Sequence, residues 1–242
     1  REAGWANCTR FDEAKHHLNI SMCGWGLTDQ DIAHWVAWFG RHAATFRGGL
    51  GLPTGEHAPP AEVDFAENRL TNAGIKVLLE AMLEAGVAAR RLKLHHNRLS
   101  SSQGVAEFLK NCRGTLHELH LSHNDLDTAA AAQIVLAAAA ARDEQGRLCY
   151  PRSEGGGRGA APLWLRLEQN FINHAQLLQS VADGAPELNR TGWVMCNATN
   201  KGCTPHSCAR HRHDPAAIHA KQLANQRTPR AATLAAQAAQ AP

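Results

Sequence analysis

The fold is decided by one stretch of sequence, Leu119-His120-Leu121-Ser122-His123-Asn124. Its pattern is apolar, x, apolar, x, x, Asn, and three further stretches repeat it: Val63–Asn68, Leu92–Asn97 and Leu165–Asn170. Alternating apolar residues place both apolar side chains on one face of a short strand. The Asn follows where the chain turns away, and its amide can bridge backbone groups that would otherwise be unpaired inside the turn. Each copy therefore predicts a strand followed by a turn.

A fifth and earlier copy is Leu18–Cys23, which ends in Cys where the others have Asn. In every copy an apolar residue follows the turn, and these residues are Leu70, Leu99, Leu126, Ile172, and Trp25 or Leu27 in the first copy. The asparagines at 68, 97 and 124 are 29 and 27 residues apart, and a regular spacing of this size indicates a repeat array.

Two longer gaps interrupt the period, of 45 residues after Cys23 and 46 residues after Asn124. We interpret both as insertions, near residues 48–60 and 142–161. The second contains a run of glycines from 155 to 157, and we expect a flexible surface excursion there, with Cys149 as an ordinary thiol.

Helices are expected between the strands, because strands that run parallel need crossover connections. Apolar residues at helical spacing follow a capping residue in each case. The caps are Thr71 or Asn72, Ser100 to Ser102, Asp127 with Thr128, Asn173, and a capping box of Thr28 with Asp31.

On these motifs the stretch from Leu18 to about residue 189 resembles the ribonuclease-inhibitor class of leucine-rich repeats, which also accepts Cys at the Asn position. The resemblance covers about two-thirds of the chain. It implies an α/β solenoid, with parallel strands inside, helices outside and about five repeats, whose usual role is protein binding. We expect residues 1–17 to form an N-terminal flank or cap, 18–189 the solenoid, 190–219 a Cys/His-rich basic module, and 220–242 an Ala/Gln-rich low-complexity tail.

Between the buried strand residues lie side chains that would face the concave side of the solenoid. We predict that a protein partner contacts Asp64, Arg91, Lys93, His95, His120, Trp164 and Arg166. Trp and Arg favour this interpretation because they are typical residues of binding hot spots. The alternative is a solvated sheet face without a partner. The histidines indicate a weak pH sensitivity of binding near neutrality rather than a metal site.

A second cluster, in the C-terminal part, combines cysteine and histidine with the spacing Cys196-x6-Cys203-x4-Cys208-x2-His211. Zinc prefers four tetrahedral ligands of these two types, and a metal would supply the folding energy that so small a segment lacks. His213 is the main alternative to His211, and His206 or His219 could also replace it. The other interpretation is a set of ordinary thiols in a disordered basic tail.

This segment resembles a compressed CCCH-type zinc finger over about 16 residues. The resemblance implies that Cys196, Cys203, Cys208 and His211 bind zinc and that the finger contacts single-stranded RNA. Lys201, Arg210 and Arg212 would then face phosphates. The aromatic residues that stack on bases in such fingers are missing between the ligands.

Charge and composition give expectations for the protein's partners and for its cellular compartment. The net charge is +3, but the segment from Arg190 to Arg230 has seven basic residues and one acid. An odd number of cysteines, seven, favours reduced thiols and an intracellular compartment, the cytoplasm or nucleus.

The chain has no apolar run of the roughly 18 residues that span a bilayer, so we expect no membrane association. It starts without Met or a signal peptide, and we expect it to be a piece or a trimmed form of a longer protein.

The sequence shows no nucleophile–base pair, no paired carboxylates in a recognisable motif and no nucleotide-binding loop, so we predict that the protein is not an enzyme and has no small-molecule substrate. The leading hypothesis is a protein-binding scaffold with an appended zinc module. The alternative is an RNA-binding regulator whose finger contacts RNA while the repeats dock a protein.

Overall fold

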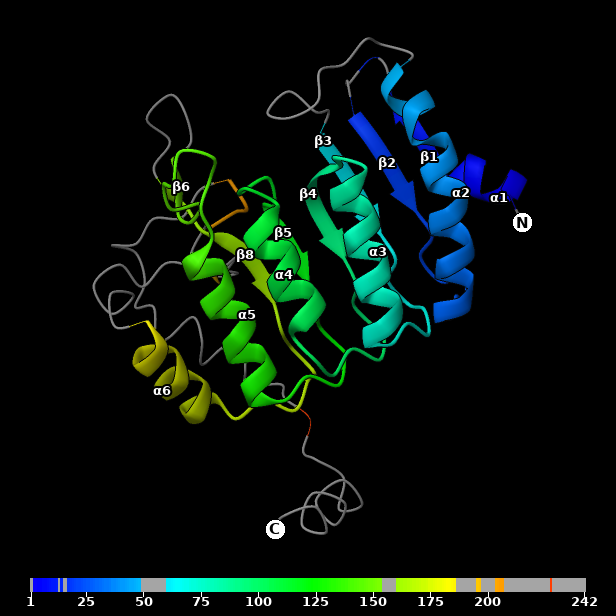
Figure 1. Cartoon of the computed structure of the whole chain (residues 1–242). Helices are drawn as coiled ribbons and strands as arrows, with labels where there is room; N and C mark the ends of the chain where they lie inside the picture. Colours follow the sequence, from blue (N-terminus) through cyan, green and yellow to red (C-terminus); the bar gives the residue numbers. More distant parts are fainter. Residues whose placement is uncertain are drawn as a thin grey trace.

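The computed structural model describes residues 2–12, 14, 17–48, 60–153, 160–185, 195–196, 203–206 and 227. Within these residues the chain forms an α/β fold with one sheet and a layer of helices, α2 to α6, along one of its faces (Figure 1). No described helix combines the length and apolarity needed to cross a membrane.

The main sheet has seven described strands in the order β1-β2-β3-β4-β5-β8-β9. Their bounds are β1 Thr9–Asp12, β2 His17–Ser21, β3 Pro60–Asp64, β4 Ala88–Lys93, β5 Glu118–His120, β8 Leu163–Arg166 and β9 Met195–Cys196. All neighbouring pairs are parallel except β1 and β2, which are antiparallel. Parallel strands with helical crossovers agree with the α/β arrangement that the repeated motif predicts.

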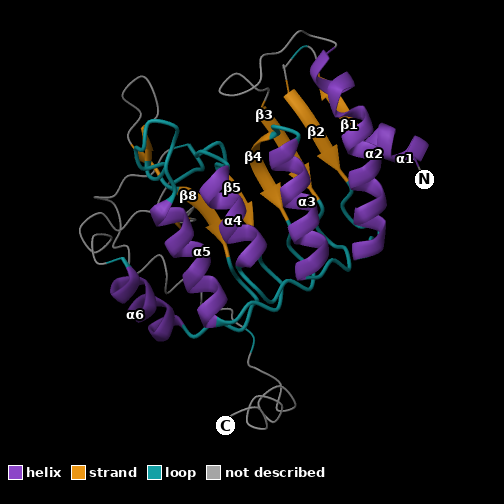
Figure 2. Ribbon diagram, in the orientation of Figure 1, coloured by secondary structure: helices purple, strands orange, loops and turns teal. Residues whose placement is uncertain are grey.

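Helices α2 to α6 follow the parallel strands β2, β3, β4, β5 and β8 in turn and lie side by side in chain order, whereas α1 precedes the sheet (Figure 2). Their bounds are α1 Glu2–Cys8, α2 Asp29–Gly48, α3 Asn72–Glu84, α4 Gln103–Asn111, α5 Thr128–Ala140 and α6 His174–Gly184. The predicted caps at Thr71, Asp127 and Asn173 are confirmed, since each side chain accepts a hydrogen bond from a backbone N–H in the first turn. The Thr28–Asp31 capping box is confirmed as well. Ser102 precedes α4 but makes no side-chain capping bond.

The core lies between the sheet and the helices. One row of strand residues runs across it in register and is almost fully buried, namely Ile20, Val63, Leu92, Leu119 and Leu165. In α5 the side chains that face this core are mostly alanine, which lets the helix pack closely against its neighbours. The alternation read from the sequence is therefore correct for the strands.

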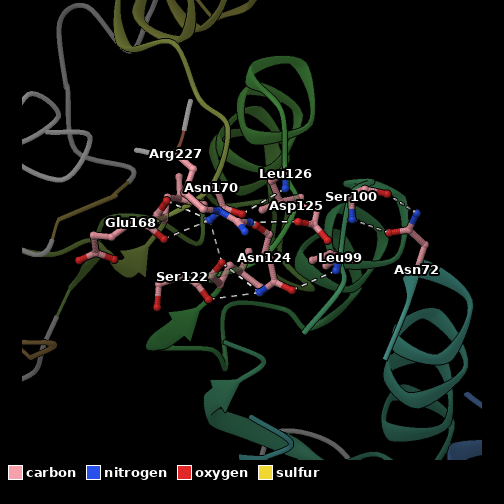
Figure 3. Close-up of polar contacts among 12 residues, drawn as sticks. Asn72, Leu99, Ser100, Ser122, Asn124, Asp125, Leu126, Glu168, Asn170 and Arg227 are labelled. Carbon is pink, nitrogen blue, oxygen red and sulfur yellow. Dashed lines mark hydrogen bonds and ion pairs between the residues drawn. The ribbon is translucent and has the colours of Figure 1, made fainter. Parts of the chain in front are cut away.

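The turn asparagines form a ladder of hydrogen bonds along one end of the sheet (Figure 3). Asn124 donates to the carbonyl oxygens of Leu94 (2.9 Å) and Leu121 (3.1 Å) and accepts from the Leu99 N–H (3.0 Å). Leu121 belongs to the same unit, whereas Leu94 and Leu99 belong to the preceding one. The same pattern is made by Asn68, Asn97 and Asn170. Each buried amide thus bonds backbone groups inside its turn, as the motif predicts, and in addition it joins two neighbouring units.

The residue before each of these asparagines has a left-handed backbone, with φ between 54° and 59°. These residues are Glu67, His96, His123 and Gln169. The equivalent position of the first unit is Gly24, with φ 73°. The tight turn sets this conformation, which costs about 1–2 kcal/mol for a residue with a side chain.

The register predicted for the first unit is wrong by two residues. Ile20 pairs with Val63, so the ladder position that Asn68 occupies falls at Trp25 and not at Cys23. Trp25 cannot make the amide bonds of the ladder. Its ring lies instead against α1, where a Cβ added to Gly4 would be 3.1 Å from it.

The hydrogen bonds of the turn support this corrected register, because the Leu27 N–H donates to Asn68 Oδ1 at 2.9 Å. Leu27, and not Trp25, is therefore the apolar residue after the turn. The sequence could not distinguish the two registers, since strand alternation repeats every two residues and Leu18, Ile20 and Met22 satisfy either one.

Residues before the first parallel strand close that edge of the sheet. β1 covers the free side of β2, and Trp5 of α1 is buried with its ring centroid 5.9 Å from that of Trp38. This arrangement suits the flank or cap expected for residues 1–17.

The excursion predicted for 142–161 lies on the surface from Glu144 to Leu148, but the residues that follow are anchored in the core. Tyr150 is 2% exposed, and its hydroxyl donates to the Leu116 carbonyl oxygen at 2.7 Å. Cys149 is buried beside it, and short strands β6 (Arg152–Ser153) and β7 (Ala160–Ala161) pair antiparallel. The glycines on which the prediction of flexibility rests occupy 155–157, outside the described residues. They do not predict the burial of the residues that precede them.

Candidate functional site

The face of the sheet that points away from α2 to α6 is called the open face below. Two rows of side chains cross it in register. The first row is Asn19, Glu62, Arg91, Glu118 and Trp164; the second is Ser21, Asp64, Lys93, His120 and Arg166. Six of the seven side chains predicted to contact a partner, all but Trp164, reach the surface of this face or its margin, where His95 follows β4.

Arg91 is the central side chain of the first row. Its Nη1 lies 3.0 Å from Glu62 Oε1 and its Nη2 lies 2.7 Å from Glu118 Oε1, so it bridges β3 and β5. The Arg91 side chain is 34% exposed and that of Glu118 only 9%. A partly buried guanidinium held by two carboxylates has little rotational freedom, and it presents a fixed direction to any partner.

One ion pair lies within the second row, and another joins it to the first row. Lys93 Nζ lies 2.9 Å from Asp64 Oδ2, and His120 Nε2 lies 3.3 Å from Glu118 Oε2. Burial would raise the pKa of Glu118, but hydrogen bonds from His120 and Arg91 outweigh it and bring this pKa to about 2. Glu118 therefore stays ionised at every pH at which proteins are ordinarily handled and anchors both rows.

Histidines gather at the margin of the open face beside the turns. The rings of His96 and His123 stack at 3.9 Å, and the ring of His95 lies 6.2 Å from that of His120. Burial is the main cause that lowers the pKa of both His95 and His123, and neighbouring histidines lower it further. These two rings are thus neutral at pH 7, and their charge changes on the acid side of neutrality.

Trp164 does not offer its ring to the surface. It is 7% exposed and packs in a small apolar cluster with Cys196 and Cys203, which are 1% and 4% exposed. Strand β9 causes this burial, because Cys196 pairs with Trp164 across β8 and β9. The hot-spot role predicted for Trp164 is therefore not supported by its position.

Of the predicted zinc ligands, the structure describes Cys196 and Cys203 and brings them together. Cys208, His211 and the alternates His213 and His219 lie outside the described residues, as do the basic residues Lys201, Arg210 and Arg212. Among the residues that the structure does describe, no three His, Cys, Asp or Glu side chains are arranged to hold a metal. His206 is described, and its ring lies 5.9 Å from that of His117.

One contact was not anticipated from the sequence: Arg227 lies at the ladder end of the last two units (Figure 3). Its Nη2 donates to the Asn124 carbonyl oxygen and lies 3.0 Å from Asp125 Oδ1. Its Cζ lies 4.3 Å from the centroid of the Phe171 ring, and its backbone N–H donates to the Asn170 carbonyl oxygen at 2.7 Å. No local motif marks residue 227 as a docking residue.

No protein-family model matches the sequence, and a search of curated proteins finds no significant match.

Proposed function

We propose that this chain is a leucine-rich-repeat scaffold, similar to the ribonuclease-inhibitor class, which binds a protein partner on its open face and has no enzymatic activity. The asparagine ladder and the succession of strand, turn and helix in each unit support the proposed repeat. The observation that carries the proposed function is the pair of rows on the open face, in which charged side chains are fixed by ion pairs across neighbouring strands.

Fixed side chains suit recognition because association then costs less conformational entropy. The rows carry both signs of charge, with Arg91, Lys93 and Arg166 among Glu62, Asp64 and Glu118. Such a pattern favours a protein surface of complementary charge over a nucleic acid, which would need a field of one sign.

Charge reversal tests this function. The variant Lys93→Glu with Arg166→Glu changes two side chains of the open face, and Lys76→Glu is the matched control on α3, where Lys76 is 48% exposed. Full-length chains are immobilised, proteins retained from an extract of the source cells are identified, and the Kd of each purified candidate is measured. We expect at least tenfold weaker binding of the partner to the double variant and unchanged binding to the control. Equal binding by both variants, with equal thermal stability, would rule out the open face.

We further propose that Cys196, Cys203, Cys208 and His211, or His213 in its place, hold one structural zinc ion. The support for this site is the meeting of two buried cysteines beside Trp164 on the last strands of the sheet. Thiolate and imidazole are the donors that zinc prefers, and a bound ion would fasten β9 over the exposed end of the core. Such a site needs reduced cysteines, in keeping with the intracellular compartment expected from the sequence.

Elemental analysis of the purified, reduced chain tests the metal site, with Cys203→Ser and Cys208→Ser as ligand variants and Cys23→Ser as the control, because Cys23 is exposed on another strand end. We expect about one zinc per chain in the parent and control and none in the ligand variants. The parent without zinc would contradict the site. RNA binding that requires zinc and is lost with Arg210→Ala and Arg212→Ala would identify the finger as an RNA module instead of a structural cap.

A further inference from the structure

The contacts of Arg227 define a small site on the ladder end of the last two units. It consists of the Asn124 and Asn170 carbonyl oxygens, the Asp125 carboxylate and the ring of Phe171. Asp125 and Arg227 are more than 100 positions apart in the chain, so this contact joins two distant segments. The site shares no residue with the open-face rows or with the cysteine cluster.

The position of Asp125 and Phe171 in the repeat is informative. Each follows a ladder asparagine directly, and the backbone N–H at this position donates to a carbonyl oxygen of the preceding unit. The same place is filled by Arg69 and Arg98 in the earlier units, where the same backbone bond forms. The ladder therefore needs only the backbone here and does not dictate the side chain. The acid and the aromatic residue that the last two units have here, in place of the two earlier arginines, are therefore not required by the ladder.

The chemistry of the site selects arginine. A guanidinium is planar, so it can donate along its edge to the Asn124 carbonyl and Asp125 while its face covers the Phe171 ring. A lysine ammonium has three N–H donors and could reach the same two oxygens, but it has no planar face to lie on the Phe171 ring. The bond from the Arg227 N–H to Asn170 adds a contact that only a residue within a peptide can make in this form.

The contact is partly exposed to solvent. The Arg227 side chain is 39% exposed and that of Asp125 is 43% exposed, and ion pairs with this degree of exposure contribute only modestly to stability. From these observations we propose that the site binds an arginine-containing peptide segment of a partner protein, and that the chain's own Arg227 occupies it in the absence of that partner. Arg227 then acts as a competitor in cis, and it lowers the affinity for the segment in trans.

The test measures fluorescence anisotropy of a labelled peptide of residues 222–232 with full-length chains. On the Arg227→Ala chain, whose site is vacated, we expect at least tenfold tighter peptide binding than on the wild type. The matched control is Arg230→Ala, which removes the neighbouring arginine of the same segment and should bind the peptide as the wild type does. Equal binding by the Arg227→Ala and wild-type chains would overturn the proposal.

Three further comparisons define the site and its ligand. In the Arg227→Ala chain, Asp125→Asn and Phe171→Leu should each weaken the peptide at least fivefold while the unfolding temperature stays unchanged. A peptide with Lys in place of its Arg227 should lose at least fivefold as well. An unrelated Ala/Gln peptide with a single arginine should retain binding within about threefold. If it does not bind, the site serves the chain's own tail alone, and the partner segment is refuted.

Discussion

Replacing Asn124 by alanine is the most direct perturbation of the repeat. The side chain is fully buried, and its amide serves the Leu99 N–H and the Leu94 carbonyl oxygen of the preceding unit. Alanine leaves the Leu99 N–H buried without a partner, whereas the Leu94 carbonyl oxygen keeps its bond from the Asn97 amide at 3.1 Å. An unsatisfied buried polar group costs about 1–3 kcal/mol, so we expect a loss of about 1–3 kcal/mol in the free energy of unfolding. A typical domain has only about 5–15 kcal/mol in total.

Urea unfolding followed by circular dichroism measures this loss, with the slope of the transition monitored to ensure that midpoints can be compared. The control is Asn111→Ala in α4, because Asn111 is exposed and makes one hydrogen bond to the Glu107 carbonyl oxygen. We expect the control to change the free energy of unfolding by less than about 0.5 kcal/mol. If the two variants were equally stable, the ladder would not be what holds neighbouring units together.

Two further predictions concern backbone and charge. Gly114 and Gly146 both have φ 75°, but a Cβ on Gly114 would be 3.0 Å from the Cys149 Cβ, whereas one on Gly146 would meet nothing within 4 Å. Gly146→Ala should therefore lower the free energy of unfolding by about 1–2 kcal/mol, and Gly114→Ala should lower it by clearly more. Equal thermal unfolding temperatures would contradict the packing described for the insertion. The pKa of Glu118 is lowered to about 2 in the fold, from about 4.3 in an unfolded chain, so its stabilising contribution is complete above about pH 4.5 and is lost as the pH falls toward 2. Glu118→Gln should flatten the dependence of the free energy of unfolding on pH over this window. An unchanged dependence would show that the ion pairs of the open face do not stabilise the fold.

The sequence allowed much of the fold to be predicted, because its signals are local. The Asn at the end of each strand and the capping residues Thr71, Asp127 and Asn173 act within a few residues of themselves, so their roles could be inferred without the structure. The alternation that identifies the other strands also explains why the register predicted for the first unit is wrong. Alternation has a period of two, and only the missing Asn, replaced by Trp25, could have fixed the register.

The features that could not be predicted depend on distant contacts. The Tyr150 hydroxyl donates to the Leu116 carbonyl oxygen, and Trp164 packs in a buried cluster with Cys196 and Cys203. No local sequence pattern shows that a residue will be covered by a distant segment. The site of Arg227 is a contact of this kind. A comparison of repeat positions could have indicated it, because Asp125 and Phe171 depart from the arginines that fill the same place in the two earlier units.

Site-specific photo-crosslinking tests whether a protein partner binds the open face. A benzophenone amino acid is placed at Lys93 on the open face and, as the control, at Lys76 on α3, and each full-length chain is irradiated with its candidate partner. We expect a covalent adduct from position 93 and none from position 76. An adduct from position 76 alone would show that the partner binds the helices, and the open face would not be the binding surface.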